Sequence, residues 1–142
     1  EVFVPSATVH RRIRARLREM AIDPANVVLH TNDYSDVWIR DYGPTFVVNR
    51  ALGEAAMVRW EFNAWGNKYE NQLTDAKIPG LMNRWMDLRV FEPKIVLEGG
   101  SIDVNGRGTV LTTRACLLNQ NRNPALGSGE IEDIYGEIDG LV

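Results

Sequence analysis

Apolar residues at helical spacing mark the start of the chain. Apolar residues recur every three or four positions at Val9, Ile13, Leu17 and Met20. The five arginines among residues 11–18 fall mainly on the other faces of the predicted helix. Ser6 precedes this run as a favourable N-cap, and Asp23-Pro24 ends it. The pattern predicts a helix, then a buried strand over Val27 to Leu29, then a polar loop over Thr31 to Ser35.

Apolar residues at alternate positions, Phe46 and Val48 and then Ile102 and Val104, together with turn signals, predict two β-hairpins farther along the chain. Their turns are Leu52-Gly53-Glu54 and Asn105-Gly106-Arg107-Gly108, the second being the strongest turn signal in the sequence. The paired segments are Thr45–Asn49 with Ala55–Glu61, and Ser101–Val104 with Thr109–Thr113. Each hairpin is followed by an aperiodic stretch of ordered loop, Phe62 to Tyr69 and Cys116 to Pro124, and such loops often carry function.

Helical and strand patterns fill the remaining segments. Leu73 to Asp87 predicts a helix broken at Pro79-Gly80, and Lys94 to Leu97 predicts a strand. Ser128 is expected to cap a last helix, with one apolar face formed by Ile131, Ile134, Tyr135 and Ile138.

An internal repeat is visible once these elements are aligned. Asp41 and Glu98, 57 residues apart, each close a mostly apolar run, and each is followed two residues later by a glycine and then by alternating apolar residues. Repeats are to be recognised before any fold assignment. We therefore expect one domain over 1–142, with repeat units at about 36–93 and 94–142 after a helix-strand half module at 1–35. Two carboxylates at equivalent points suit a cationic substrate.

Composition narrows the function classes. The 142 residues carry a net charge of −3, and the basic residues cluster mainly between His10 and Arg18, so nucleic-acid binding is not expected. No apolar run is long enough to span a membrane. With one cysteine there is no disulfide framework, which favours a cytoplasmic protein. No group of His, Cys and acidic residues has metal-ligand spacing, so no metal site is expected.

Four segments in register resemble the agmatine deiminase and bacterial peptidyl-arginine deiminase family. They are Asp36 to Asn49 (DVWIRDYGPTFVVN), Trp60 to Gly66 (WEFNAWG), Leu97 to Ile102 (LEGGSI), and Gly108 to Thr113 (GTVLTT) running on into Cys116–Asn119 and Asn121–Pro124. The resemblance implies the α/β pentein fold, a propeller of five ββαβ modules around a central active site. About two and a half modules would be present here. A further N-terminal module, a His-x-Asp segment and the nucleophilic Cys of such enzymes are expected outside these 142 residues, so the chain is expected to be an inactive fragment.

The resemblance also implies site residues. Asp41 would grip the substrate guanidinium, and Trp38 would form a flat wall for that cation. Glu98 would orient the catalytic His, while the Cys thiolate attacks the guanidinium carbon and water resolves the covalent thiouronium to a ureido product. The expected catalytic residues are thus Asp41 and Glu98, and the expected substrate-binding residues are Trp38 and Asp41. The expected partner is a small guanidino substrate, agmatine or arginine, and the implied chemistry needs no metal or organic cofactor.

Each assignment has a structural alternative. Asp41 would otherwise pair with Arg40 or Arg59, and Glu98 would cap backbone amides of its glycine turn. The remaining tryptophans are expected in the core. The other residues with reactive side chains receive no catalytic role. His10 and His30 are expected to be structural or solvent-facing, and Cys116 is expected to be a buried apolar residue. Asn63, Lys68 and Arg122 are loop residues at the mouth of the site without an assigned function.

Two other functions stay open at this point. One is another pentein chemistry, amidino transfer or dimethylarginine hydrolysis, although the FNAWG and NRNP segments favour the deiminases. The other is a non-catalytic half-propeller that binds or assembles. Exposed module edges would leave unpaired strands, so a homo-oligomer or poor solubility is expected.

Overall fold

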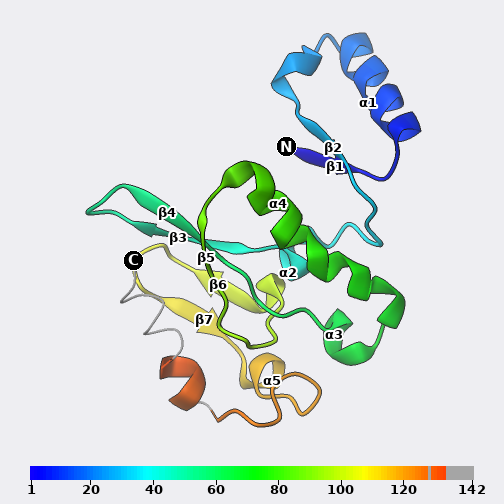
Figure 1. Cartoon of the computed structure of the whole chain (residues 1–142). Helices are drawn as coiled ribbons and strands as arrows, with labels where there is room; N and C mark the ends of the chain where they lie inside the picture. The colour runs from blue at the N-terminus through cyan, green and yellow to red at the C-terminus, as the bar shows by residue number, and fades with distance from the viewer. Residues whose placement is uncertain (128, 134–142) are drawn as a thin grey trace. The chain divides into compact units, whose positions relative to one another are not determined.

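The computed structural model describes residues 1–127 and 129–133, and these fall into two compact units, residues 1–35 and the described residues from 36 onward. Both mix α and β structure in small sheets (Figure 1). Among the described residues, no helix has the length and apolar character needed to cross a membrane. Groups of three or more potential metal ligands are likewise absent from this part of the chain.

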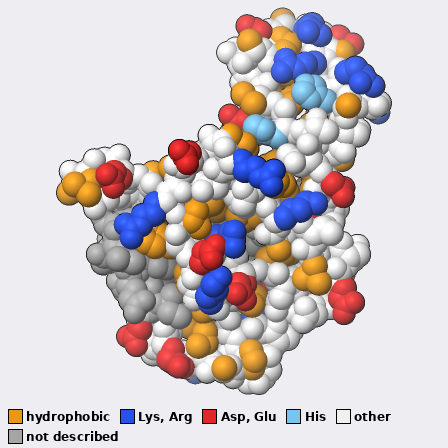
Figure 2. Space-filling model, in the orientation of Figure 1, with side chains coloured by type: hydrophobic (Ala, Val, Ile, Leu, Met, Phe, Trp, Pro, Cys, Tyr) orange, Lys and Arg blue, Asp and Glu red, His pale blue; other side chains and the backbone are white. Residues whose placement is uncertain are grey.

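The first unit is a βαβ arrangement built around one helix. Strands β1 (Val2–Val4) and β2 (Leu29–Thr31) pair in parallel, and α1 (Ala7–Glu19) connects them through a short 3-10 turn at Pro24–Asn26. The Ser6 hydroxyl accepts a hydrogen bond from the Val9 amide, so the predicted helix and its cap are confirmed. Lys and Arg side chains gather over α1 (Figure 2).

The strand in this unit lies two residues later than predicted. Val28 is 46% exposed, whereas Leu29 is buried and pairs with Val2. Strand β1 was not predicted, because a three-residue apolar run carries almost no periodicity of its own. The pairing of Val2 in β1 with Leu29 determines where β2 begins.

The first hairpin of the second unit is confirmed and belongs to a larger sheet. Strands β3 (Thr45–Asn49) and β4 (Glu54–Val58) are antiparallel, and β5 (Arg89–Phe91), which was not predicted, pairs in parallel with β4. The return from β4 to β5 runs through α3 (Ala64–Asn67), a 3-10 segment at Glu70–Lys77 and α4 (Ile78–Met86).

The predicted break at Pro79-Gly80 is wrong. Pro79 lies in the first turn of α4, where its missing N–H costs no intrahelical bond, so the change of helix type occurs at Lys77 instead. Asp87 ends α4 with a φ of 51°.

The second hairpin follows the same plan as the first, with strands β6 (Ile102–Val104) and β7 (Val110–Thr112). The Asn105 side chain accepts hydrogen bonds from the amides of Arg107 and Thr109, which closes the predicted turn. The predicted strand over Lys94 to Leu97 is confirmed only in part: Val96 forms a single parallel bridge with Glu61, whose backbone bonds the Ile95 carbonyl and the Leu97 amide. Of the last helix, Ser128, Ile134, Tyr135 and Ile138 lie outside the described residues.

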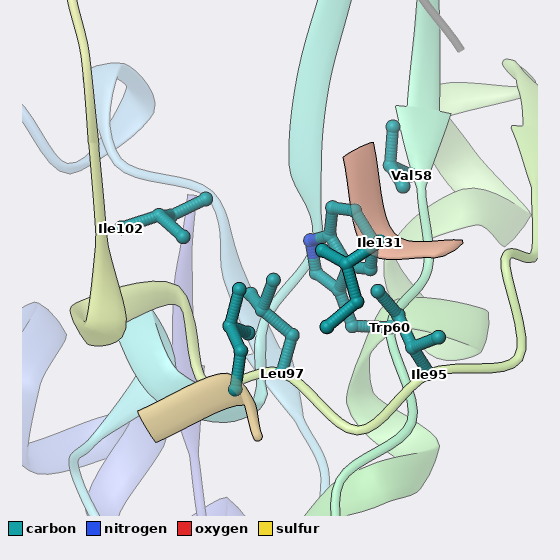
Figure 3. Packing of buried hydrophobic residues seen from close by; sticks show 7 residues of the cluster. Val58, Trp60, Ile95, Leu97, Ile102 and Ile131 are labelled. Atoms are coloured by element: carbon teal, nitrogen blue, oxygen red, sulfur yellow. The ribbon is translucent and has the colours of Figure 1, made fainter. Parts of the chain in front are cut away.

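One apolar core holds the hairpin segments of the second unit together (Figure 3). Its members come from the end of β4 and just after it, from the segment before β6 and the start of β6, and from two later helical segments: Val58, Trp60, Ile95, Leu97, Ile102, Leu117 and Ile131. Trp60 is 8% exposed, as expected of a core tryptophan, and its indole N–H donates to the Thr45 hydroxyl at 3.0 Å. Buried Ile95 and Leu97 place Glu98 directly beside this core.

Candidate functional site

The two segments that carry the acids Asp41 and Glu98 pack against each other. Asp41 lies in α2 (Ile39–Tyr42), a single helical turn, and Glu98 immediately precedes a 3-10 turn at Gly99–Ser101. The turns are so close that a Cβ at Gly99 would lie 2.1 Å from the Arg40 carbonyl oxygen. Only glycine permits this approach.

The Asp41 carboxylate is held at both oxygens. Oδ1 accepts the Gly100 amide at 2.9 Å, and Oδ2 accepts the indole N–H of Trp65 at 3.0 Å. A carboxylate oxygen can accept about two hydrogen bonds, so each oxygen keeps capacity for a ligand. A Cβ at Gly100 would lie 2.3 Å from Oδ1, so this position also requires glycine.

Trp65 reaches Asp41 from an unusual turn. The four residues of α3, Ala64 to Asn67, all have positive φ, between 52° and 79°, which makes this a left-handed turn. The Asn63 side chain accepts the Gly66 amide at 2.8 Å and so caps the turn. The Trp65 ring packs edge-to-face on Phe62 and Tyr69, with centroids 5.1 and 5.8 Å away. The expectation of a core role for Trp65 is wrong, whereas that of an ordered loop is confirmed.

Glu98 is nearly buried, at 6% exposed, and is paired with a cation. Its Oε1 accepts the Arg122 Nε–H at 2.5 Å, and Arg122 Nη1 donates to the Asn121 side chain at 2.8 Å. Buried Asn123 anchors this loop, because its amide group bonds both the N–H and the C=O of Val96 at 2.9 Å and the Leu117 carbonyl at 2.8 Å. The anchor holds Arg122 at Glu98.

The structural alternatives for the two acids do not fit this arrangement. Arg40 donates to the Ile102 carbonyl, and Arg59 pairs with Glu92 at 2.6 Å. Within residues 1–127 and 129–133, Asp41 forms no salt bridge with either arginine. The Glu98 side chain does not cap its turn, since Asp41 takes the Gly100 amide instead.

Glu92 is a surface acid whose pKa departs from its ordinary value. The hydrogen bond from Lys94 and then the charge of Arg59 lower the pKa of this carboxyl. The Glu92 carboxylate is exposed, and its ion-pair partners are Arg59 and Lys94. It therefore pairs with Arg59 without contributing to the candidate site.

A pocket of about 750 Å³ opens beside Asp41. Its lining combines acidic, basic, amide and aromatic side chains: Asp36, Trp38, Asp41, Trp65, Lys68, Tyr69, Gln72, Asn119, Asn121 and Arg122. The predicted residues Asp41 and Trp38 are thus brought together, with Trp38 58% exposed. Glu98 does not line the pocket, but its partner Arg122 does.

Most of the lining was not predicted as site residues. Lys68 and Arg122 were noted without a role, and Trp65 was assigned to the core. Apart from Asp36 and Gln72, the lining residues that were missed come from the two aperiodic loops. The signal that could have found them is the combination, in these loops, of many polar and aromatic residues with no helical or strand periodicity.

The other residues with reactive side chains lie elsewhere. His10 contacts the Thr31 hydroxyl and accepts a hydrogen bond from Arg14, and His30 contacts Glu1, all within the first unit. Cys116 is half-buried in α5 (Arg114–Leu117).

Comparison with known proteins gives a consistent set of relatives. The model of the Porphyromonas-type peptidyl-arginine deiminase family matches residues 1–141. An agmatine deiminase of Pseudomonas fluorescens is 42% identical over 134 residues, which cover 91% of this chain and 35% of the relative. This chain therefore spans about a third of the length of such a relative.

Solved structures agree. An agmatine deiminase of C. jejuni with substrate bound matches with a TM-score of 0.76 and 33% identity, over 98% of this chain and 39% of that one. An agmatine deiminase of Enterococcus faecalis matches with a TM-score of 0.67 and 34% identity, over 86% of this chain and 34% of that one. By its sequence and its fold, the chain belongs to the Porphyromonas-type peptidyl-arginine deiminase family.

Proposed function

We propose that this chain is part of a deiminase that converts a guanidino group and water into a ureido group and ammonia. The observation that carries the proposal is the contact between the Asp41 and Glu98 turns, since Asp41 lines the pocket and Glu98 lies behind it, paired with the lining residue Arg122. Family membership supports it. Because the chain spans about a third of its relatives, the activity is proposed for the whole protein.

Asp41 and Trp38 are proposed to bind the guanidinium. A planar guanidinium is a fork of N–H donors that pairs with a carboxylate through two parallel bonds. Asp41 is already held in a fixed orientation and lines the pocket. The exposed Trp38 ring in the same lining offers a flat, electron-rich face to a delocalised cation.

Glu98 is proposed to orient the catalytic His, which would come from outside these 142 residues. Arg122 occupies Oε1 of the buried carboxylate, which leaves Oε2 to accept a ring N–H. A carboxylate in this position fixes the ring and stabilises its protonated form.

The chemistry then follows in two displacements. A Cys thiolate, also from outside this chain, bonds to the guanidinium carbon, and ammonia leaves with a proton from the His. Water, deprotonated by the His, attacks the resulting thiouronium carbon, and the C–S bond breaks to give the ureido product and the thiolate. No step requires electron transfer.

The proposed architecture is about two and a half modules of a five-module propeller. In support, each of the two hairpins follows a helical turn that carries one of the acids, and the two turns are in contact. The names of the relatives make agmatine the first substrate to test, ahead of peptidyl arginine.

The test is an assay of ureido product and ammonia with the whole protein, given agmatine or an arginine peptide. We expect turnover, and we expect Asp41→Asn to lower kcat/KM by about 100-fold, since it removes a charge-assisted pair. Residues 1–142 alone should not turn over either substrate. A whole protein inactive on every guanidino compound, or an Asp41→Asn variant with full activity, would overturn the proposal.

A further inference from the structure

We infer that Trp65 is a positioning residue for Asp41. Its indole N–H fixes the rotation of the carboxylate, so that the remaining acceptor lone pairs of both oxygens face the pocket. The inference rests on the proposed function of Asp41. Trp65 lies in the FNAWG segment. It was not among the expected site residues, and it has no role in the proposed reaction.

The hydrogen bonds around Asp41 show why a second donor matters. The last torsion of an Asp side chain is broad, so one donor leaves the carboxylate free to turn. Here the Gly100 amide holds Oδ1 at 2.9 Å and the Trp65 indole holds Oδ2 at 3.0 Å. The two donors come from segments 35 residues apart, and together they define the carboxylate plane.

The backbone that carries Trp65 is held in a conformation that side chains rarely adopt. Trp65 itself has φ 57° and ψ 46°, within four consecutive residues of positive φ. Left-handed residues normally occur singly, and bulky ones seldom. Such an arrangement persists only where its surroundings enforce it, and it clusters at functional sites.

The surroundings that enforce it can be named. Asn63 caps the turn from one side, and its own amide donates to the Asn121 carbonyl at 2.8 Å. Gly66 lies directly against Arg122, because a Cβ there would be 2.2 Å from Nη1. The turn is thus wedged between Asp41 and the arginine that pairs with Glu98, and it links the placement of the two acids.

The first test needs no activity. In the whole protein labelled with ¹⁵N at tryptophan, the indole N–H signal of Trp65 is followed in an Asp41→Ala variant, after assignment by Trp65→Phe. We expect the Trp65 signal to move and the indole signals of Trp60 and Trp85 to stay. A Trp65 signal unchanged by loss of the carboxylate would overturn the inference.

The second test separates positioning from packing in the whole protein. Trp65→Phe should lower kcat by roughly 10- to 100-fold with a smaller change in KM, because a misplaced carboxylate still attracts the cation but aligns it poorly. Trp60→Phe is the matched control, since it also loses an indole hydrogen bond, to Thr45 in the core, and should keep kcat.

A benzothiophene isostere of the Trp65 side chain covers the case in which Trp65→Phe fails to fold. It keeps both fused rings and lacks only the N–H. We expect the same loss of kcat, and full kcat with the isostere would overturn the inference. If the unmodified protein proves inactive on guanidines, the proposed function fails, while the indole signal still decides the contact between Trp65 and Asp41.

Discussion

At the scale of single residues, two consecutive glycines allow the turns next to Asp41 and Glu98 to pack together. Gly99 and Gly100 face the Arg40 carbonyl and the Asp41 carboxylate at distances that exclude a Cβ. Neither glycine has a positive φ, so the requirement comes from space alone. The glycine at position 100, which the sequence marked only as a turn signal, is therefore a contact surface for the segment that carries Asp41.

Gly100→Ala should displace the Asp41 carboxylate. The added Cβ would lie 2.3 Å from Oδ1, so we expect a loss of about 1 to 3 kcal/mol in unfolding free energy and weaker binding of a guanidinium ligand. Urea unfolding and calorimetry measure the two effects. Gly129→Ala is the matched control, since nothing lies within 4 Å of its Cβ. Equal effects at both positions would contradict the prediction.

The Arg122 side chain neutralises a buried charge. Side-chain exposure in the Arg122–Glu98 pair is 14% and 8%, so Arg122→Met should leave an unpaired buried carboxylate and cost about 3 kcal/mol or more. The surface pair of Arg16 and Glu19 is 72% and 63% exposed, and Arg16→Met should change stability by less than about 0.5 kcal/mol. Comparable losses in urea unfolding would show that Glu98 is not buried as described.

At the scale of elements, an anchored loop places Arg122 at its partner. Asn123 uses both ends of its amide group, as acceptor for the Val96 N–H and as donor to the carbonyls of Val96 and Leu117. On the other edge of this segment, the Glu61 backbone bonds the Ile95 carbonyl and the Leu97 amide. The Asn123 side chain thus does for Val96 what a second neighbouring strand would do, since it satisfies both of its backbone groups.

Asn123→Ala should therefore loosen the loop and cost about 2 to 3 kcal/mol, because buried backbone groups lose their partners. Asn123→Asp keeps the shape and the acceptor but cannot donate, so it should be destabilised as well. Hydrogen exchange at the Val96 amide, which is protected by the Asn123 oxygen, should rise in the alanine variant. An unchanged exchange rate would contradict the anchoring role.

The N-cap of α1 offers a local comparison. Ser6→Ala removes the acceptor for the Val9 amide and should cost about 1 kcal/mol, whereas Ser6→Asp should retain most of the stability. Thermal unfolding followed by circular dichroism measures both variants. Because the cap belongs to the first unit, guanidinium binding at Asp41 is expected to stay unchanged.

At the scale of the whole molecule, apolar side chains lie exposed on the strands of the second unit. Phe46 and Val48 on β3 are 47% and 58% exposed, and Leu111 on β7 is 66% exposed. Strand β3 is also an edge of its sheet. Exposed apolar edges favour pairing with another chain.

We therefore expect residues 1–142 to self-associate. Light scattering should give a mass above that of one chain, and Phe46→Lys with Val48→Lys should lower it. Arg11→Lys and Arg12→Lys in α1 are the control. These two substitutions also introduce exposed lysines, but they leave the net charge and the edge strand unchanged. A monodisperse monomer at all concentrations would contradict this prediction.

How far the sequence reaches depends on where each signal originates. Both hairpins follow from local turn residues, notably the glycines and Asn105, and the helix α1 follows from its period and its cap. Asp41 and Trp38 were predicted for the site through the family motif, and they share a pocket in the structure. Their roles in catalysis and binding stay predictions.

What only the tertiary structure decided is the set of contacts between distant segments. Strands β1 and β5 are short, and they exist because a partner strand satisfies their backbone. Trp65 resembled a core aromatic by composition, yet a left-handed turn carries its N–H to a carboxylate 24 positions earlier. The sequence by itself determined the two acids, their glycine turns and the hairpins, because local chemistry encodes them; which residues hold the acids depended on packing across the chain, which no local pattern records.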